Sequence, residues 1–231
     1  MRKDLVDATV DAVVDRILRG TYREGDALPG EVDLSQELAV SRLTVREAVK
    51  VLKERGVLDV VQGRGTFVAD RSRWTDLPTL IAVSLAESSP REVGLRLVEL
   101  RRMIEVGAAG LAARNRSDED VEALASLIGE MDAAGDAGDI AANVEADLAF
   151  HRRVLLASRN PFIPVVMAPL EHALHDSRLV TAARPEVRER AQGHHRAIFD
   201  AIRTRDEEAA KDAMRAHMTQ TRLDLVANTA E

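Results

Sequence analysis

The sequence predicts a mainly α-helical protein, in which an N-terminal winged helix-turn-helix precedes an all-helical antiparallel bundle of six to seven helices. Residues 34–68 contain two amphipathic helical segments, a tight turn between them and two β-branched runs around a glycine-rich tip. From residue 78 onward the apolar residues recur only at helical spacing. With 231 residues, of which 45% are hydrophobic, the chain is long enough to build two separate cores.

The N-terminal part begins with an amphipathic helix over residues 4–19, which Gly20 ends. The helix that follows the turn at residues 39–40 has both of its boundaries encoded. Ser41 is suited to cap its amino end, and Gly56 is suited to end it in a left-handed conformation. Its apolar face consists of Val45, Ala48, Val49 and Leu52.

A basic stripe on another face of this helix consists of Arg42, Arg46, Lys50 and Lys53. A helix fits the major groove of B-form DNA, where Arg pairs with guanine and Lys neutralises phosphates. The alternative is an ordinary solvated surface. The order of helix, turn, basic helix and wing favours the DNA-binding interpretation.

The two β-branched runs, residues 57–61 and 66–68, are expected to pair as a hairpin wing. The turn between them is Gln62-Gly63-Arg64-Gly65. Its glycines let the tip approach a phosphate backbone or enter a minor groove, and Arg64 supplies positive charge.

The formal net charge is −7, which is unusual for a protein that binds DNA, but the charge is unevenly distributed. Residues 41–65 contain six Lys or Arg and three Asp or Glu. Such a local positive field predicts modest non-specific affinity and reliance on paired half-sites in a homodimer. Cysteine is absent from the sequence, as are a signal-peptide core and any run of about 18 apolar residues. We therefore expect a soluble cytoplasmic protein without a membrane partner.

The order of these features, and above all the SRLTVREA opening of the basic helix at residues 41–48, resembles the winged helix-turn-helix of the GntR family of bacterial transcription regulators. The resemblance covers about the first 70 residues. Val32 stands where family members usually carry an Arg that helps to grip DNA, so one usual contact is missing. The resemblance implies binding to double-stranded operator DNA through Ser41, Arg42, Thr44, Arg46, Lys50, Gly63, Arg64 and Gly65.

A DNA-binding domain over residues 1–70 and a polar linker at 71–76 are expected to precede a helical domain over 77–231. Short connections between its helices imply an antiparallel arrangement. The helices are predicted at residues 78–88, 91–114, 118–134, 140–158, 161–180, 186–204 and 206–228.

Four ionisable residues fall on inward helix faces, where the pattern calls for apolar residues: Asp147, His151, His195 and His217. Burying such groups without partners costs on the order of several kcal/mol. Either each forms its own hydrogen bond in the core, or the four share one metal ion. Nitrogen and oxygen ligands without sulfur suit Zn²⁺, Mn²⁺, Ni²⁺ or Fe²⁺.

Arg101 presents a similar choice on the helix predicted at 91–114. It could pair with Glu105 one turn later. Alternatively, its guanidinium points into a cavity and binds an anionic ligand bidentately.

The second half of the chain resembles the FCD effector-binding domain of FadR-type GntR regulators. The resemblance is carried by Glu99-Leu100-Arg101 with Glu105, the segment 147–152, Asn160-Pro161, His195-Arg196-Ala197-Ile198 and His217. It implies one divalent metal ion per chain, bound by Asp147, His151, His195 and His217. It also places Arg101 and Asn160 near a small carboxylate effector.

These features together indicate a ligand-responsive transcription regulator, most simply a repressor, that acts as a homodimer on a palindromic operator and is not an enzyme. The metal would anchor the effector. Two alternatives stay open: a metal-dependent hydrolase or lyase with an appended DNA-binding domain, and a constitutive DNA-binding protein whose helical part only dimerises.

Overall fold

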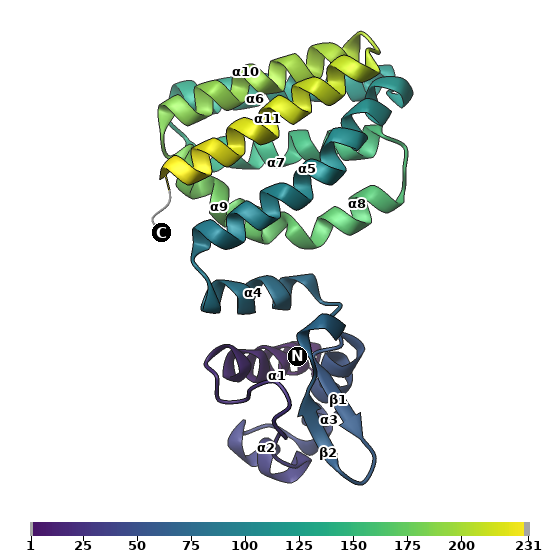
Figure 1. Cartoon of the computed structure of the whole chain (residues 1–231), viewed down its shortest axis with the longest axis vertical. Helices are drawn as coiled ribbons and strands as arrows, with labels where there is room; N and C mark the ends of the chain where they lie inside the picture. The colour runs from purple at the N-terminus through teal and green to yellow at the C-terminus, as the bar shows by residue number, and fades with distance from the viewer. Residues whose placement is uncertain (1, 229–231) are drawn as a thin grey trace. The chain divides into compact units, whose positions relative to one another are not determined.

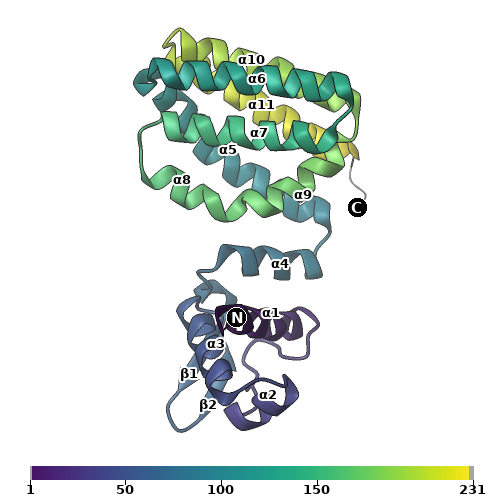
Figure 2. The same cartoon turned by 180° about the vertical axis from the view of Figure 1, so that it is seen from behind.

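A computed structural model describes the chain from residue 2 to residue 228, including the side chains of residues 5–170, 173–175 and 178–228. The chain divides into two compact units, Met1–Ser88 and Ser89–Glu231 (Figure 1, and from behind in Figure 2). Helices dominate both units, and the first also carries a two-stranded sheet. The predicted fold class, a winged helix-turn-helix followed by a helical domain, is confirmed.

The first unit follows the predicted order of elements. Helix α1 (Arg2–Leu18) packs against α3, and so does the short helix α2. The bounds of α2 are Glu31–Glu37 and those of α3 are Arg42–Glu54. Strands β1 (Leu58–Val61) and β2 (Gly65–Val68) form the wing. Helices α1 and α2 thus both pack against α3.

Helix α3 owes its position to the apolar face that the sequence predicts. Val45, Ala48 and Leu52 are almost completely buried in the core of this unit. Ser41 caps the helix as expected, because its Oγ accepts a hydrogen bond from the backbone N of Thr44 at 3.1 Å. The opposite face of α3 is therefore presented outward on a fixed helix.

The wing is an antiparallel hairpin whose register runs from Leu58↔Val68 to Val61↔Gly65. Arg64 N donates to Val61 O at 3.0 Å, and Gly63 adopts a positive φ of 74°. The glycine thus takes the left-handed conformation that this tight turn requires.

The first unit also contains α4 (Leu77–Glu87), which packs against α1 and buries Val83 in the same core. Between the wing and α4 lies a short 3₁₀ helix, Arg71–Arg73. Trp74 is buried in this core, where its Nε1 donates to Ala69 O at 3.1 Å. The boundary between the two compact units follows Ser88 and therefore lies beyond the linker predicted at residues 71–76. The predicted limits of the functional domains stay a prediction.

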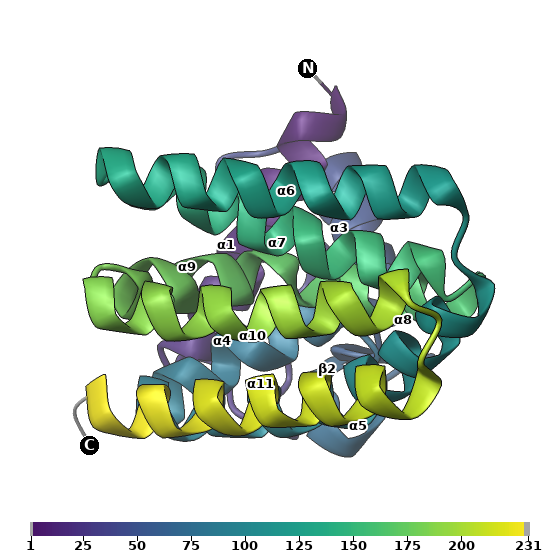
Figure 3. The same cartoon turned by 90° about the horizontal axis from the view of Figure 1, so that it is seen from above.

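Five long helices build most of the second unit: α5 (Pro90–Asn115), α6 (Asp118–Ala137), α7 (Ile140–Ala157), α10 (Pro185–Arg203) and α11 (Glu207–Asn228). Helices α6 and α7 pack together, as do α10 and α11. Because very short connections join the members of each pair, each pair is antiparallel. Figure 3 shows α6, α10 and α11 lying side by side.

The prediction of one continuous helix over residues 161–180 is wrong. The structure has α8 (Phe162–Met167), a 3₁₀ turn (Ala168–Leu170) and α9 (Glu171–Ala182) instead. Pro169 explains the interruption, because proline has no N–H to donate and its ring clashes with the carbonyl four residues earlier.

The core of the second unit is apolar around Phe150 of α7, Ile198 of α10 and Met214 of α11, all of which are fully buried. The inner faces of these same three helices also carry the predicted histidines. Among the helices described, none combines the length and apolar character that a membrane crossing requires.

The glycine that follows α3 provides a test of the first unit. Gly56 has φ 72°, and a Cβ there would lie 2.2 Å from the backbone O of Arg73. Gly20 has φ 71° but no neighbouring atom within 4 Å of an added Cβ. We expect Gly20→Ala to cost about 1–2 kcal/mol from left-handed strain alone. Gly56→Ala adds a backbone clash and should cost on the order of 3–4 kcal/mol. Equal losses in urea titrations of the two variants would contradict this packing.

Candidate functional site

The outward face of α3 carries the predicted basic residues. Arg42, Arg46 and Lys50 are exposed, whereas Val45 and Ala48 on the opposite side are buried. The hydroxyls of Ser41 and Thr44 lie 2.8 Å apart at the amino end of the helix. The helix therefore presents side chains that can bind phosphates and base edges.

One contact on this face could not be predicted from the helical pattern. Glu31, the first residue of α2, accepts two hydrogen bonds from Arg46, at 3.1 Å from Nε and 2.7 Å from Nη2. The neighbouring Val32 is 45% exposed. Because its side chain is uncharged, it cannot make the DNA contact that the resemblance expects of an Arg at this position.

The wing tip is exposed throughout the turn formed by Gly63, Arg64 and Gly65. The guanidinium of Arg64 lies 5.9 Å from the centre of the Phe67 ring. The positively charged Arg64 is thus flanked by two glycines, which have no side chain to hinder the approach of a partner.

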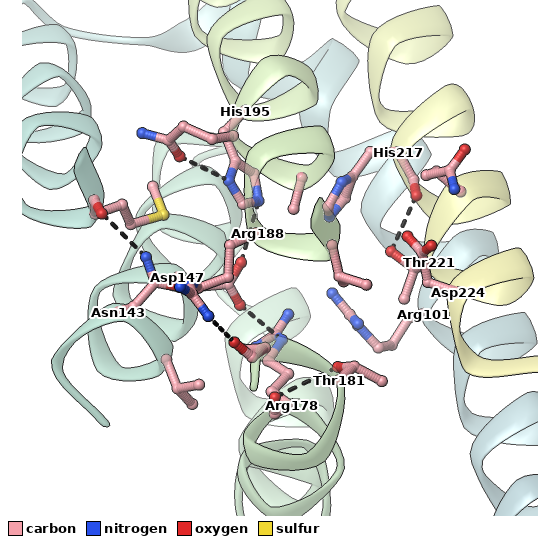
Figure 4. A pocket seen from close by; sticks show the side chains of 17 residues that line it. Arg101, Asn143, Asp147, Arg178, Thr181, Arg188, His195, His217, Thr221 and Asp224 are labelled. Carbon is pink, nitrogen blue, oxygen red and sulfur yellow. Dashed lines mark hydrogen bonds and ion pairs between the residues drawn. The ribbon is translucent and has the colours of Figure 1, made fainter. Parts of the chain in front are cut away.

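The second candidate site lies inside the helical unit, where the structure brings three predicted histidines together. Figure 4 shows His195 and His217 beside the adjoining cavity. His151 of α7, His195 of α10 and His217 of α11 are buried, and their nearest ring nitrogens lie within 4.8 Å of one another. Asp147 Oδ1 lies 3.1 Å from His195 Nε2 and 3.8 Å from His151 Nε2. The predicted quartet therefore forms one cluster.

His151 is oriented by a carboxylate behind it. Its Nδ1 lies 2.6 Å from Glu105 Oε2, and because an ionised carboxylate can only accept, Nδ1 is the donor. Burial lowers the pKa of His151 to about 4, although Glu105 acts in the opposite direction. The ring is thus neutral at pH 7, and its Nε2, which lies 3.2 Å from His217 Nε2, carries the lone pair that a metal would use.

The other two imidazoles differ in their partners. His195 Nε2 faces Asp147 Oδ1 at 3.1 Å, whereas His217 Nδ1 is buried without a hydrogen bond in the described part of the chain. Burial holds the pKa of His217 well below its ordinary value, so this ring is also neutral at pH 7. Neutral imidazoles and one carboxylate are the ligands that Zn²⁺, Mn²⁺, Ni²⁺ and Fe²⁺ accept, so these residues fit a divalent ion.

Asp147 is held from its other side by Arg178 of α9, which sequence reasoning missed. Arg178 Nε lies 2.7 Å from Asp147 Oδ2. Burial would raise the pKa of Asp147, but Arg178 and the hydrogen bond with His195 outweigh it and keep the pKa well below its usual range. The carboxylate is therefore ionised. Burial also lowers the pKa of Arg178 to about 10.

The structure combines both interpretations of Arg101. Its Nε donates to Glu105 Oε1 at 2.6 Å, and only 2% of the residue is exposed. Its Nη2 has no hydrogen-bond partner among the described residues, and the side chain lines the cavity beside His195 and His217 (Figure 4). Arg101 is thus paired through one edge and available through the other.

This cavity has a volume of about 70 Å³. Since one water needs about 10–15 Å³ by the same kind of measure, the space suits a small molecule of a few polar groups. Its wall also includes Asn143, Arg188, Thr221 and Asp224.

Asn160, which the resemblance placed near the effector, does not line this cavity. It lies in the turn between α7 and α8, where its Oδ1 accepts from Phe162 N at 3.1 Å. Its own N donates to Ser158 Oγ at 3.2 Å. The side chain thus stabilises an Asx-type turn, and its contact with a ligand stays a prediction.

Comparison with known proteins agrees with both parts of this geometry. Residues 5–68 match the gntR family of bacterial regulatory proteins, and residues 96–220 match the FCD domain. The chain belongs to the GntR family. GntR-family proteins with an FCD domain are DNA-binding transcription regulators and not enzymes, which removes the hydrolase or lyase alternative.

Full-length relatives support the same assignment. The galactonate operon transcriptional repressor of Escherichia coli (strain K12) is 30% identical over 220 residues, covering 92% of this chain and 93% of the repressor. The HTH-type transcriptional repressor NanR of Klebsiella aerogenes is 30% identical over 226 residues, covering 94% of this chain and 84% of NanR. The solved structure of Streptococcus agalactiae GntR superposes with a TM-score of 0.54 at 28% identity, covering 94% and 99% of the two chains.

The ion pair behind the histidines can be tested by a stability measurement. Glu105→Ala should leave the buried Arg101 guanidinium unpaired and cost about 3–5 kcal/mol of unfolding free energy. A matched control is Glu92→Ala, which removes a pair with Arg96 at the same spacing on the same helix, with side chains 51% and 65% exposed. We expect no measurable loss from the control. Denaturant titrations with a chelator present compare the two, and similar losses would contradict the buried role of Glu105.

Proposed function

We propose that this GntR-family regulator binds a palindromic operator as a homodimer, and that a metal ion and a small carboxylate in the helical unit modulate this binding. The observation that carries the proposal is the placement of three buried imidazoles and the Asp147 carboxylate beside the unpartnered Nη2 of Arg101. Burying so many polar groups is costly unless a ligand satisfies them.

The DNA-binding half of the proposal rests on α3 and the wing. Exposed Arg42, Arg46 and Lys50 can bind base edges and phosphates in a major groove. Ser41 and Thr44 lie at the amino end of the helix, where backbone N–H groups favour a phosphate. The tip formed by Gly63, Arg64 and Gly65 supplies a contact to the flanking backbone or minor groove.

In the helical half, Asp147, His151, His195 and His217 would hold the metal. The ion would supply positive charge and coordination positions for a carboxylate. Arg101 would donate from Nη2 to the same ligand, while Glu105 fixes both Arg101 and His151 in place. Zn²⁺, Ni²⁺, Mn²⁺ and Fe²⁺ all suit this donor set.

A relative that represses a galactonate operon supports a small acid as effector, because galactonate belongs to this class. The effector would act by binding one arrangement of the protein more tightly than another, which shifts the population that binds DNA.

The metal site predicts a defined loss on mutation. His217→Ala should remove most of the bound metal because it deletes one of the clustered ligand nitrogens, while DNA binding without effector persists. His175→Ala is the control, since this histidine lies outside the cluster. Elemental analysis of full-length proteins loaded with Zn²⁺ and dialysed measures the difference. Full metal content in His217→Ala would refute the ligand set, and metal-free wild-type protein would favour the constitutive alternative.

Arg46 tests the DNA interface. Arg46→Ala should weaken binding to duplexes selected by the wild-type protein from a random pool by at least about tenfold, because a good Arg–base contact contributes about 1–3 kcal/mol. Arg19→Ala removes an equal charge from the residue that follows α1 and should have little effect. Unchanged affinity of Arg46→Ala in a fluorescence anisotropy titration would refute the assignment of α3 as the reading helix.

A further inference from the structure

An acidic side chain occupies the face of the first unit that is proposed to meet DNA. Glu31 begins α2, whose Leu34 and Ser35 are buried and which packs against α3. Both carboxylate oxygens bind the same guanidinium, that of Arg46, at 2.7 Å and 3.1 Å. The pair is bidentate although it is largely open to solvent, with 61% of the Arg46 side chain exposed.

The pairing uses only one edge of the guanidinium. Arginine carries five N–H donors in a fixed planar fork. Glu31 accepts from Nε and from one hydrogen of Nη2, which form the side-on edge. One hydrogen of Nη1 and the other hydrogen of Nη2 form the end-on edge and stay free of this carboxylate. Guanine O6 and N7 require two parallel donors, which the end-on edge provides.

We propose that Glu31 is a positioning residue for DNA reading, which holds Arg46 through its side-on edge so that the end-on edge meets a guanine. This inference rests on the proposed DNA interface and adds a specificity determinant on a different helix. Arg46 would otherwise lose rotamer freedom on binding, and ordering it beforehand removes part of that cost.

Supporting observations concern the charge and its surroundings. Hydrogen bonding to Arg46 holds the pKa of Glu31 below its ordinary value, so the carboxylate is ionised at neutral pH. Val32 places no second guanidinium beside it on α2. Arg42 also lies close enough to stabilise the carboxylate, but the described hydrogen bonds of Glu31 go to Arg46.

The opposite expectation follows if Glu31 only repels phosphates. An acidic residue near DNA lowers affinity for every sequence, so removing it would strengthen all binding. A positioning residue behaves differently, because its removal should weaken the selected site and relax base preference while binding to unrelated DNA stays the same or rises. Removing a positioning residue therefore lowers sequence specificity without lowering the affinity for unrelated DNA.

The experiment measures the affinity of the full-length protein for two probes: a duplex selected by wild-type protein from a random pool, and a scrambled duplex of equal composition. Glu31→Ala is compared with Asp33→Ala, which removes the same charge from the same exposed first turn of α2. We expect Glu31→Ala to bind the selected duplex about five- to tenfold more weakly than the control does. The ratio of the affinity for the selected duplex to the affinity for the scrambled duplex should fall. A new selection with Glu31→Ala should show weaker guanine preference at one position of each half-site.

Arg46→Ala completes a double-mutant cycle and separates the possible failures. If positioning is correct, Glu31→Ala has no weakening effect in the Arg46→Ala background. Binding of Glu31→Ala that equals or exceeds that of Asp33→Ala, with unchanged base preference, would overturn the positioning role while the loss in Arg46→Ala still supports the interface. If Arg46→Ala itself retains full affinity, the interface is misassigned and the positioning role falls with it.

Discussion

A single buried carboxylate organises the helical unit. Glu105 accepts from Arg101 Nε through one oxygen and from His151 Nδ1 through the other, at 2.6 Å in both cases. Burial alone would raise the pKa of this carboxyl, but Arg101 and His151 together hold it below its usual range. The bridge therefore fixes an arginine and an imidazole from two helices at once. The other nitrogen of His151 faces His217 Nε2 at 3.2 Å, and Arg101 lines the cavity beside His217.

The apolar core explains why this polar arrangement is possible. Phe150, Ile198 and Met214 are fully buried, and they belong to the three helices that carry the histidines. Phe150 also contacts His195, with ring centres 4.9 Å apart. Tight packing thus restricts the imidazoles to one orientation. The buried His217 Nδ1 and Arg101 Nη2, which have no hydrogen-bond partner among the described residues, make the site costly in the absence of a ligand. An effector that relieves this cost binds with a free-energy gain that can be coupled to the DNA-binding unit.

Local signals explain which features could be predicted from the sequence. The bounds of α3 and the wing follow from Ser41, Gly56 and the glycine-rich turn, because caps and turns depend on neighbouring residues. Helical periodicity placed the histidines on inward faces, and the family resemblance grouped them.

Long-range partners explain what could not be predicted. Periodicity specifies a face but not the residue that meets it, so Arg178 opposite Asp147 and Glu31 opposite Arg46 were missed. Pro169 is the one local signal for the break between α8 and α9, and helical periodicity alone does not register it. Asn160 was placed by family resemblance alone, whereas locally it forms a turn.

The proposed sensing depends on one ion that Asp147, His151, His195 and His217 would share. X-ray diffraction from crystals of the purified protein, recorded on both sides of the absorption edges of zinc, nickel, iron and manganese, tests this most directly. We expect one anomalous peak per chain, in contact with all four side chains. Imidazoles that bond only to one another, with no anomalous density between them in metal-supplemented crystals, would contradict it.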